Sequence, residues 1–152
     1  MRFLKLRWVV FFLSFNACHL MSAAAQPAVL APVERNGFTT VTSYDTLQAF
    51  LREIAQLPFI HVEQIAQTRQ GRSVNVVRIS TPQDSAARIR ILLFAQQHGD
   101  EPAGKEALTL LLAKVASGEL QNLLSRIDLF VIPLMNPDGA ELHQRRTASA
   151  ST

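Results

Sequence analysis

The chain has 152 residues, of which 48% are hydrophobic and 18% charged. This composition is typical of one globular domain and excludes collagen-like, Pro/Gly-rich and highly charged disordered chains. The formal net charge of +3 is matched by Arg2, Lys5 and Arg7 at the start of the chain. The rest of the chain is therefore neutral overall, and its charge does not favour a nucleic-acid partner.

Residues 1–25 have the features of a secretory signal peptide. The three basic residues precede an apolar segment that opens with residues 8–15, and three alanines at residues 23–25 form a typical cleavage site. Asn16 and His19 interrupt the apolar segment, which is shorter than the about 20 residues needed to span a bilayer. The sequence therefore predicts a secreted or periplasmic protein that has no stable membrane association after cleavage.

Cys18 is the single cysteine of the chain. Lipid modification at this residue is an alternative to cleavage after Ala25. Cleavage there removes the cysteine, so the mature chain has no disulfide, and any metal site in it must use histidine and carboxylate ligands instead of thiolates.

Residues 26–41 contain two prolines and several small apolar side chains, which indicate an extended lead-in and not a packed element. Residues 44–56 predict an amphipathic helix, because large apolar side chains recur on one face: Leu47, Phe50, Leu51 and Ile54. Thr42 or Ser43 is suited to cap its first turn, and Pro58 ends it.

Residues 62–68 and 73–80 predict two strands, and Gln70 and Gly71 between them indicate a turn, so we expect a β-hairpin. Residues 88–96 have a continuous apolar centre instead of an alternating pattern. A continuous run favours an interior strand with both faces covered.

Residues 102–116 predict a helix, because Pro102 suits a first turn and Gly118 suits a C-terminal cap. Its expected core stripe is Leu108, Leu111, Leu112 and Val115. A short helix is predicted at residues 120–124, followed by a second apolar strand at residues 127–135. This strand–helix–strand order predicts that the two apolar strands are parallel.

The predicted fold class is α/β, a partial mixed sheet with flanking helices. Residues 42–147 are expected to form the domain, and residues 148–152, which are small and polar, a disordered tail. Ligands of open α/β sheets bind beyond the carboxyl ends of parallel strands. Residues 98–101 and the turn at residues 136–139 follow the two apolar strands, so we expect the chemistry of the protein there.

His98 and Glu101 are spaced so that an imidazole nitrogen and a carboxylate oxygen can meet at one ion across a strand-to-helix turn. Both are zinc ligands, and Gly99 lets the backbone bend between them. The alternative is an ordinary loop histidine and a carboxylate favoured by the helix dipole. Catalytic zinc usually holds three protein ligands, and His143 is a candidate for the third, with His61 a weaker one.

Arg145 and Arg146 form a basic pair shortly after the second segment. An arginine fork suits a carboxylate, or the oxygen of a carbonyl polarised near a metal. The alternative is a solvated basic pair.

Together these segments resemble the zinc carboxypeptidase family, the carboxypeptidase A-like metallopeptidases. Residues 98–104, with the sequence His-Gly-Asp-Glu-Pro-Ala-Gly, match the first metal motif of that family, and residues 136–139 match its Asn-Pro-Asp-Gly hallmark. Arg145 fits the position of the family's carbonyl-polarising arginine better than Arg146 does. Residues 70–73 resemble the family's early Gly-Arg hairpin.

The resemblance covers about residues 43–149 and implies the N-terminal half of a zinc carboxypeptidase, which acts on peptides with a free C-terminus. It implies that Zn²⁺ is held by His98, Glu101 and a later histidine, that a later glutamate is the general base, and that Arg145 stabilises the oxyanion. The later motifs of the family fall beyond residue 152. We therefore expect this chain alone to bind zinc weakly and to hydrolyse no peptide.

Two other interpretations stay open. The aspartoacylase and succinylglutamate desuccinylase enzymes are similar in fold and use a like zinc site on N-acyl amino acids, although the intact Asn-Pro-Asp-Gly favours the peptidase. The isolated chain is alternatively a non-catalytic secreted domain. We also expect poor solubility, because half a sheet leaves an apolar strand edge, such as residues 127–134, without its neighbour.

Overall fold

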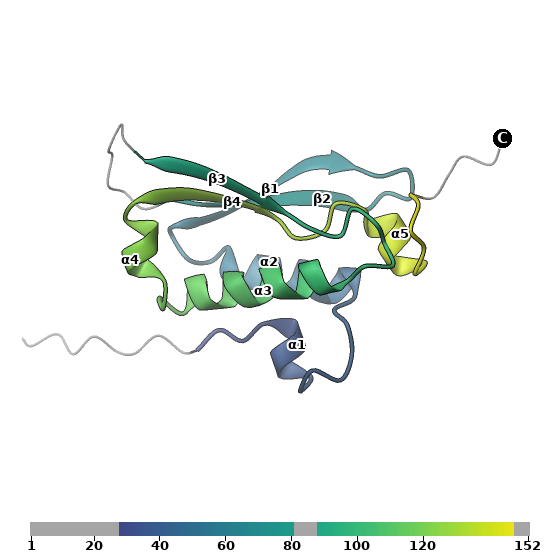
Figure 1. Ribbon diagram of the computed structural model, residues 1–152, viewed down its shortest axis with the longest axis horizontal. Helices are drawn as coiled ribbons and strands as arrows, with labels where there is room; N and C mark the ends of the chain where they lie inside the picture. Colours follow the sequence, from purple (N-terminus) through teal and green to yellow (C-terminus); the bar gives the residue numbers. More distant parts are fainter. Residues whose placement is uncertain (1–27, 81–87, 148–152) are drawn as a thin grey trace, which may run out of the picture.

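The computed structural model describes residues 28–80 and 88–147. These residues form a four-stranded sheet and five helices (Figure 1). The strands are β1 (Ile60–Gln67), β2 (Ser73–Ile79), β3 (Ile89–Phe94) and β4 (Ile127–Ile132). The helices are α1 (Pro32–Arg35), α2 (Tyr44–Ile54), α3 (Ala103–Ala116), α4 (Gln121–Leu124) and α5 (Pro137–Glu141).

The strand order in the sheet is β1-β2-β4-β3. β1 and β2 pair in antiparallel fashion, as do β2 and β4, whereas β3 and β4 are parallel, with Ile89 opposite Ile127 and Phe94 opposite Ile132. The predicted hairpin and the predicted parallel crossover are both confirmed. The sheet is therefore mixed, and the predicted α/β class is confirmed as well.

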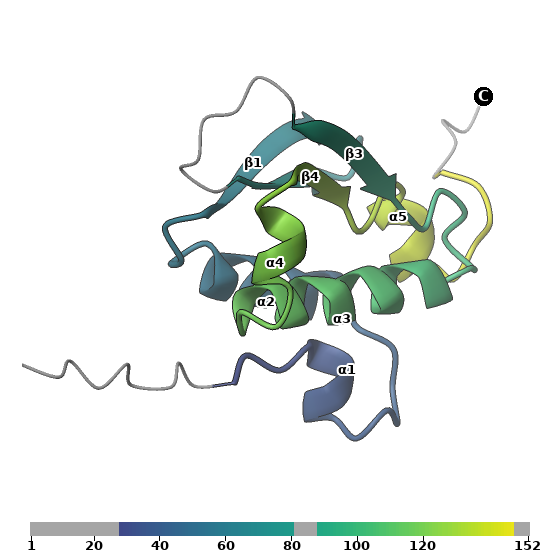
Figure 2. The ribbon, with the colours of Figure 1, turned by 60° about the vertical axis from the view of Figure 1, so that its left-hand side comes forward.

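The helices cover one face of this sheet. Figures 1 and 2 show α1, α2 and α3 on the same side of the strands, with α4 and α5 near opposite ends of the sheet. The core lies between these helices and the sheet, and its fully buried side chains include Leu47, Phe50, Ile54, Val77, Ile79, Leu112, Val115 and Val131. No helix in the described ranges covers the opposite face.

Helix α2 forms as its apolar periodicity predicts. Its four expected core residues are all buried. Of the two predicted caps, Thr42 and Ser43, the structure uses Ser43, whose side-chain oxygen accepts a hydrogen bond from the backbone N–H of Thr46 at 3.3 Å. The helix ends at Ile54, two residues before the predicted end.

Helix α3 also forms where predicted, but its buried stripe is rotated from the expected one. Leu112 and Val115 are fully buried, whereas Leu108 and Leu111 are only partly buried. Lys105 and Thr109 take their place in the interior. The helix covers the sheet with a face that includes polar side chains, which a stripe chosen by apolar residues alone does not detect.

The prediction that residues 88–96 form an interior strand is wrong. β3 lies at the edge of the described sheet, and its Ile89, Leu92 and Phe94 are 65%, 56% and 50% exposed. β4, expected at the edge, is instead flanked by β2 and β3. The two strands have similar apolar sequences. Which of them is interior depends on the neighbouring strands, and the sequence of either strand does not specify those neighbours.

The extended lead-in expected over residues 26–41 is also corrected where the structure describes it. Pro32–Arg35 form the short helix α1, and Ala31 and Val33 are buried in the core. Arg35 donates to both carboxylate oxygens of Glu53 on α2 at 2.7 Å, which fixes α1 against that helix.

The predicted signal peptide, Cys18 and the predicted tail lie outside the described residues. Within residues 28–80 and 88–147, no helix has the length and apolar character required to cross a bilayer.

Candidate functional site

The loops that follow β3 and β4 lie side by side at one end of the sheet, next to α5 (Figure 1). Backbone hydrogen bonds join them: the Met135 N–H donates to Ala95 at 3.0 Å and the Asn136 N–H donates to Gln96 at 3.1 Å. The segment of residues 136–139, expected as a turn, instead opens α5, and the Asn136 side chain caps it by accepting from the Gly139 N–H at 3.0 Å. Parallel pairing of the two strands thus brings both predicted segments to one edge.

His98 and Glu101 point toward each other across the first loop. Nδ1 of His98 and Oε2 of Glu101 are 3.0 Å apart, and both side chains are exposed to solvent. Two atoms bonded to one zinc ion at about 2.0–2.2 Å each lie at most about 4.4 Å apart, so this separation is compatible with a shared ion. Their imidazole nitrogen and carboxylate oxygen are also of the type that zinc prefers, and the pair therefore fits as two ligands of a zinc site.

Arg145 reaches the same carboxylate from the segment after α5. Its Nη1 donates to Oε1 of Glu101 at 2.6 Å, so the two oxygens of Glu101 face His98 and Arg145 respectively. The hydrogen bond to His98, and then that to Arg145, hold the pKa of the Glu101 carboxyl below its usual value of 4.5. Arg145 also lines an open pocket together with His98 and Arg146. The structure thus brings the three predicted site residues together.

The two other candidate ligands lie elsewhere. His61 is on β1, and His143 lines a separate pocket that does not include His98 or Glu101. Among the residues that the structure describes, no group of three His, Cys, Asp or Glu side chains could hold a metal ion. The described part of the chain therefore presents two side chains for a metal at this edge, and not the three of a catalytic zinc site.

A glycine contact sets the distance between the two loops. A Cβ on Gly99 would lie 2.0 Å from the carbonyl carbon of Gly139 and 2.4 Å from the backbone nitrogen of Ala140. Any side chain at residue 99 would therefore collide with the backbone of α5. Gln96, in the same loop, has a left-handed φ of 48° and donates from Nε2 to the Gly99 carbonyl at 2.8 Å, which fixes the shape of this loop.

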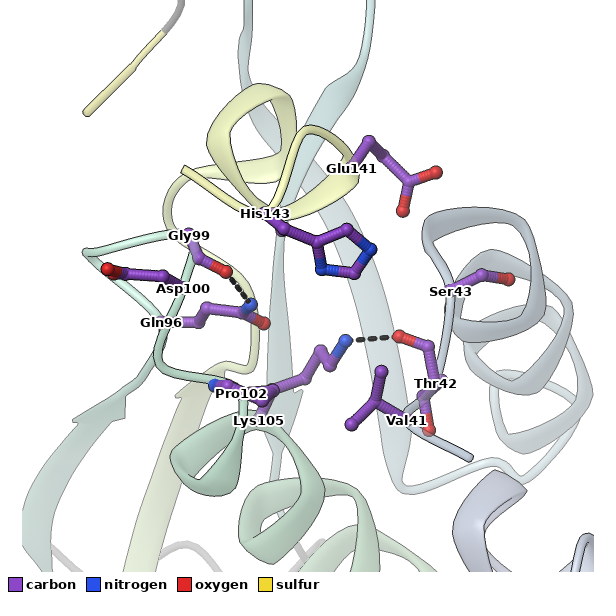
Figure 3. A pocket seen from close by; sticks show the side chains of 11 residues that line it. Val41, Thr42, Ser43, Gln96, Gly99, Asp100, Pro102, Lys105, Glu141 and His143 are labelled. Carbon is purple, nitrogen blue, oxygen red and sulfur yellow. Dashed lines mark hydrogen bonds between the residues drawn. The ribbon is translucent and has the colours of Figure 1, made fainter. Parts of the chain in front are cut away.

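The pocket beside His143 contains a buried lysine that sequence reasoning missed. Figure 3 shows Lys105 from α3 and His143 pointing into this pocket, with Nζ of Lys105 donating to the Thr42 carbonyl. The pocket has a volume of about 400 Å³. Burial lowers the pKa of Lys105, although Glu106, 3.5 Å away, opposes this effect. The helical spacing of Lys105 from Thr109 and Leu112 was the signal that could have placed it on the buried face.

Asp138 and Arg72 are a second pair that sequence reasoning did not connect. Nη1 of Arg72, at the hairpin turn, lies 2.8 Å from Oδ1 of the fully buried Asp138 on α5. Three buried side-chain atoms in the described residues have no hydrogen-bond partner, and all three belong to these loops: Gln96 Oε1, Asn136 Nδ2 and Asp138 Oδ2. Unsatisfied polar atoms are thus concentrated around the candidate site, as is common where function constrains a structure.

Comparison with known proteins gives consistent matches. The family model for zinc carboxypeptidase matches residues 47–151. Carboxypeptidase 2 of Trichophyton rubrum is 28% identical over 148 residues, which cover 91% of this chain and 28% of that protein. Carboxypeptidase M of Mus musculus is 31% identical over 108 residues, 65% of this chain and 24% of that protein.

Solved structures agree with the sequence matches. The carboxypeptidase A of Helicoverpa armigera superposes with a TM-score of 0.68 and 26% identity, over 75% of this chain and 30% of that one. The metallo-carboxypeptidase of Burkholderia cenocepacia has a TM-score of 0.59 and 29% identity, over 70% of this chain and 30% of that one. The chain thus spans less than a third of the length of these proteins.

Proposed function

The chain belongs to the zinc carboxypeptidase family, and on that premise we propose that His98, Glu101 and Arg145 are part of the catalytic site of a secreted zinc carboxypeptidase. The substrate class is a peptide with a free C-terminus. The family match and the carboxypeptidase relatives favour this substrate over the N-acyl amino acids of aspartoacylase-like enzymes.

The observation that carries the proposal is the convergence of His98 and Glu101 at the carboxyl end of β3, with Nδ1 and Oε2 3.0 Å apart. These two residues would hold the zinc ion. A bound zinc ion supplies Lewis-acid chemistry, which activates water and polarises a carbonyl.

Arg145 is the residue that the proposal assigns to stabilising charge on the substrate. Arg145 lines the open pocket and its guanidinium contacts Glu101 at 2.6 Å, so it is within reach of any group bound beside that carboxylate. A positive, donor-rich guanidinium there can stabilise the negative charge that develops on the oxygen of a scissile carbonyl. Removing one such donor typically lowers the rate by about 10²–10³-fold.

We further propose that the 152-residue chain alone is inactive. The described residues offer two converging ligands at this site, and no third His, Cys, Asp or Glu among them completes a metal-binding group. Secretion is part of the same proposal and rests on the basic and apolar pattern of residues 1–25.

Zinc titration of the purified chain, followed by calorimetry or by competition with a chromophoric chelator, tests the proposal. We expect a dissociation constant weaker than about 1 μM, because a catalytic zinc holds three protein ligands. His98→Ala and Glu101→Gln should each weaken binding at least about tenfold, since even the loss of an outer partner of a ligand costs about 10–100-fold.

His61→Ala is the matched control, because it removes an exposed imidazole on β1 away from this edge. It should leave zinc affinity unchanged. Sub-micromolar affinity with steady release of C-terminal residues would contradict the inactivity of the chain. Binding that survives His98→Ala would contradict the assigned ligands.

A further inference from the structure

We propose that Asp138 and Arg72 are positioning residues of the candidate site: their ion pair anchors α5, and α5 fixes Arg145 relative to the loop of His98 and Glu101. The inference rests on the proposed function, because it assigns a supporting role to the same site. What points to it is the juxtaposition of the hairpin turn, α5 and both site segments.

The anchor begins with a buried carboxylate. Oδ1 of Asp138 accepts from Nη1 of Arg72 at 2.8 Å and from Oγ1 of Thr68 at 2.9 Å. Both donors come from the turn between β1 and β2, far from α5 in the sequence. The other oxygen, Oδ2, is buried and has no partner in the described part of the chain. An ion pair whose carboxylate is buried with one oxygen unsatisfied gains little net stability, because the desolvation of the carboxylate offsets the attraction. Global stability is therefore a weak explanation for this arrangement.

A tyrosine links the same turn to the other end of α5. The guanidinium of Arg72 lies over the ring of Tyr44, 6.0 Å from its centroid, and the Tyr44 hydroxyl accepts from the Ser73 N–H at 2.8 Å. The backbone N–H of Tyr44 donates to Oε1 of Glu141 at 2.9 Å. Helix α5 is therefore held near its first turn by Asp138 and at its last residue by Glu141, and both contacts lead back to the hairpin turn.

Helix α5 in turn contacts both halves of the site through Gly139. The backbone of Gly139 packs against Gly99, which lies between His98 and Glu101 in the first loop. The carbonyl of Gly139 accepts from the N–H of Gln144, the residue before Arg145, at 2.9 Å. A shift of α5 would therefore move Arg145 and its Glu101 partner relative to each other, so the ion pair sets their geometry without contacting either.

The test compares the wild-type chain with Arg72→Gln, which removes the charge from a partly exposed side chain and leaves the buried Asp138 carboxylate without its charged partner. The readouts are amide hydrogen exchange at Gly139 and Gln144 and the NMR signals of the Arg145 Nε–H group and the His98 ring. We expect exchange at these two amides to rise about tenfold or more, as for a local opening. The Arg145 and His98 signals should shift, and the amides of β4 should change little.

Two further variants control the result. Arg35→Gln breaks an equally close Arg–Glu pair between α1 and α2, 2.7 Å in length, and should leave the signals of α5, Arg145 and His98 unchanged. Arg72→Lys keeps the positive charge and should restore part of the wild-type pattern. If Arg72→Gln does not fold, Thr68→Val removes the second hydrogen bond to the same oxygen and is measured by the same readouts.

Unchanged exchange at Gly139 and Gln144, or an unmoved Arg145 signal, would overturn the proposal. An equal rise at α5 and β4 would also overturn it, because the pair would then support only the fold as a whole. The measurements need no metal, so their outcome is independent of the zinc titration that tests the proposed function.

Discussion

β3 and β4 are paired residue for residue and have similar apolar sequences, yet their environments differ. Four of the six residues of β4 are buried, whereas none of the six residues of β3 is. Within the sheet formed by residues 28–80 and 88–147, β4 has a strand on each side, while β3 has one neighbour and lies at the edge. A continuous apolar run therefore indicates that a strand can be buried, and the strands beside it in the sheet determine whether it is buried.

The largest expected effect comes from a charge in β4. Val131 is fully buried, so Val131→Asp places an unpaired carboxylate in the core and should lower the free energy of unfolding by more than about 4 kcal/mol. Urea denaturation followed by circular dichroism measures it. Leu92→Asp, on the exposed face of β3, is the matched variant and should change that energy by less than about 1 kcal/mol. Similar losses of unfolding free energy in the two variants would contradict the difference in burial between β3 and β4.

A smaller effect is expected on self-association. In the described sheet, β3 has exposed apolar side chains and no strand on its outer side, and both features favour pairing between copies. The poor solubility expected from the sequence stays a prediction, with β3 instead of β4 as the strand responsible. Leu92→Lys should reduce association in sedimentation velocity while changing stability by less than about 1 kcal/mol. A monodisperse, cooperatively melting wild-type monomer would contradict this prediction.

The smallest expected effect is on acid stability, at the loop that follows β3. The pKa of Glu101 is lowered from 4.5 by its hydrogen bonds to His98 and Arg145. A lowered folded-state pKa means that the stabilisation is present above the unfolded-state pKa and is lost as the pH falls through the folded-state pKa. The stability difference between wild type and Glu101→Gln should therefore shrink as the pH falls below 4.5.

Denaturation of both proteins at several acidic pH values measures this difference. Glu119→Gln is the control at the other end of α3, where the hydrogen bond to Lys114 lowers the pKa of Glu119. The stability difference between wild type and Glu119→Gln should also shrink as the pH falls, but the His98 NMR signals should stay unchanged. A Glu101→Gln curve parallel to wild type at every pH would contradict the assigned pair.

Local patterns in the sequence predicted the elements that local physics determines. The stripe of α2, the turn at Gly71 and the crossover from β3 to β4 all depend on residues close together in the chain, and all are confirmed. The parallel pairing then placed His98–Glu101 beside the segment after β4, which periodicity alone had predicted.

The features that were missed depend on contacts between distant segments. The edge position of β3 follows from sheet order, and α1 follows from the burial of Ala31 and Val33 against α2 and α3. The sequence predicts Asp138 only as part of a turn, because its partner Arg72 is 66 residues away in the chain. Likewise, the apolar stripe predicted for α3 does not include Lys105, because a charged side chain has no place in a stripe defined by apolar residues.

The contact between Gly99 and Gly139 has a consequence for how this loop pair can evolve. A Cβ at residue 99 would meet main-chain atoms of Gly139 and Ala140, the nearest at 2.0 Å, and main-chain atoms are present whatever residue occupies those positions. A change of side chain at 139 or 140 therefore does not by itself make room, and replacing Gly99 requires the backbone of α5 to move, which is an epistatic constraint on this position.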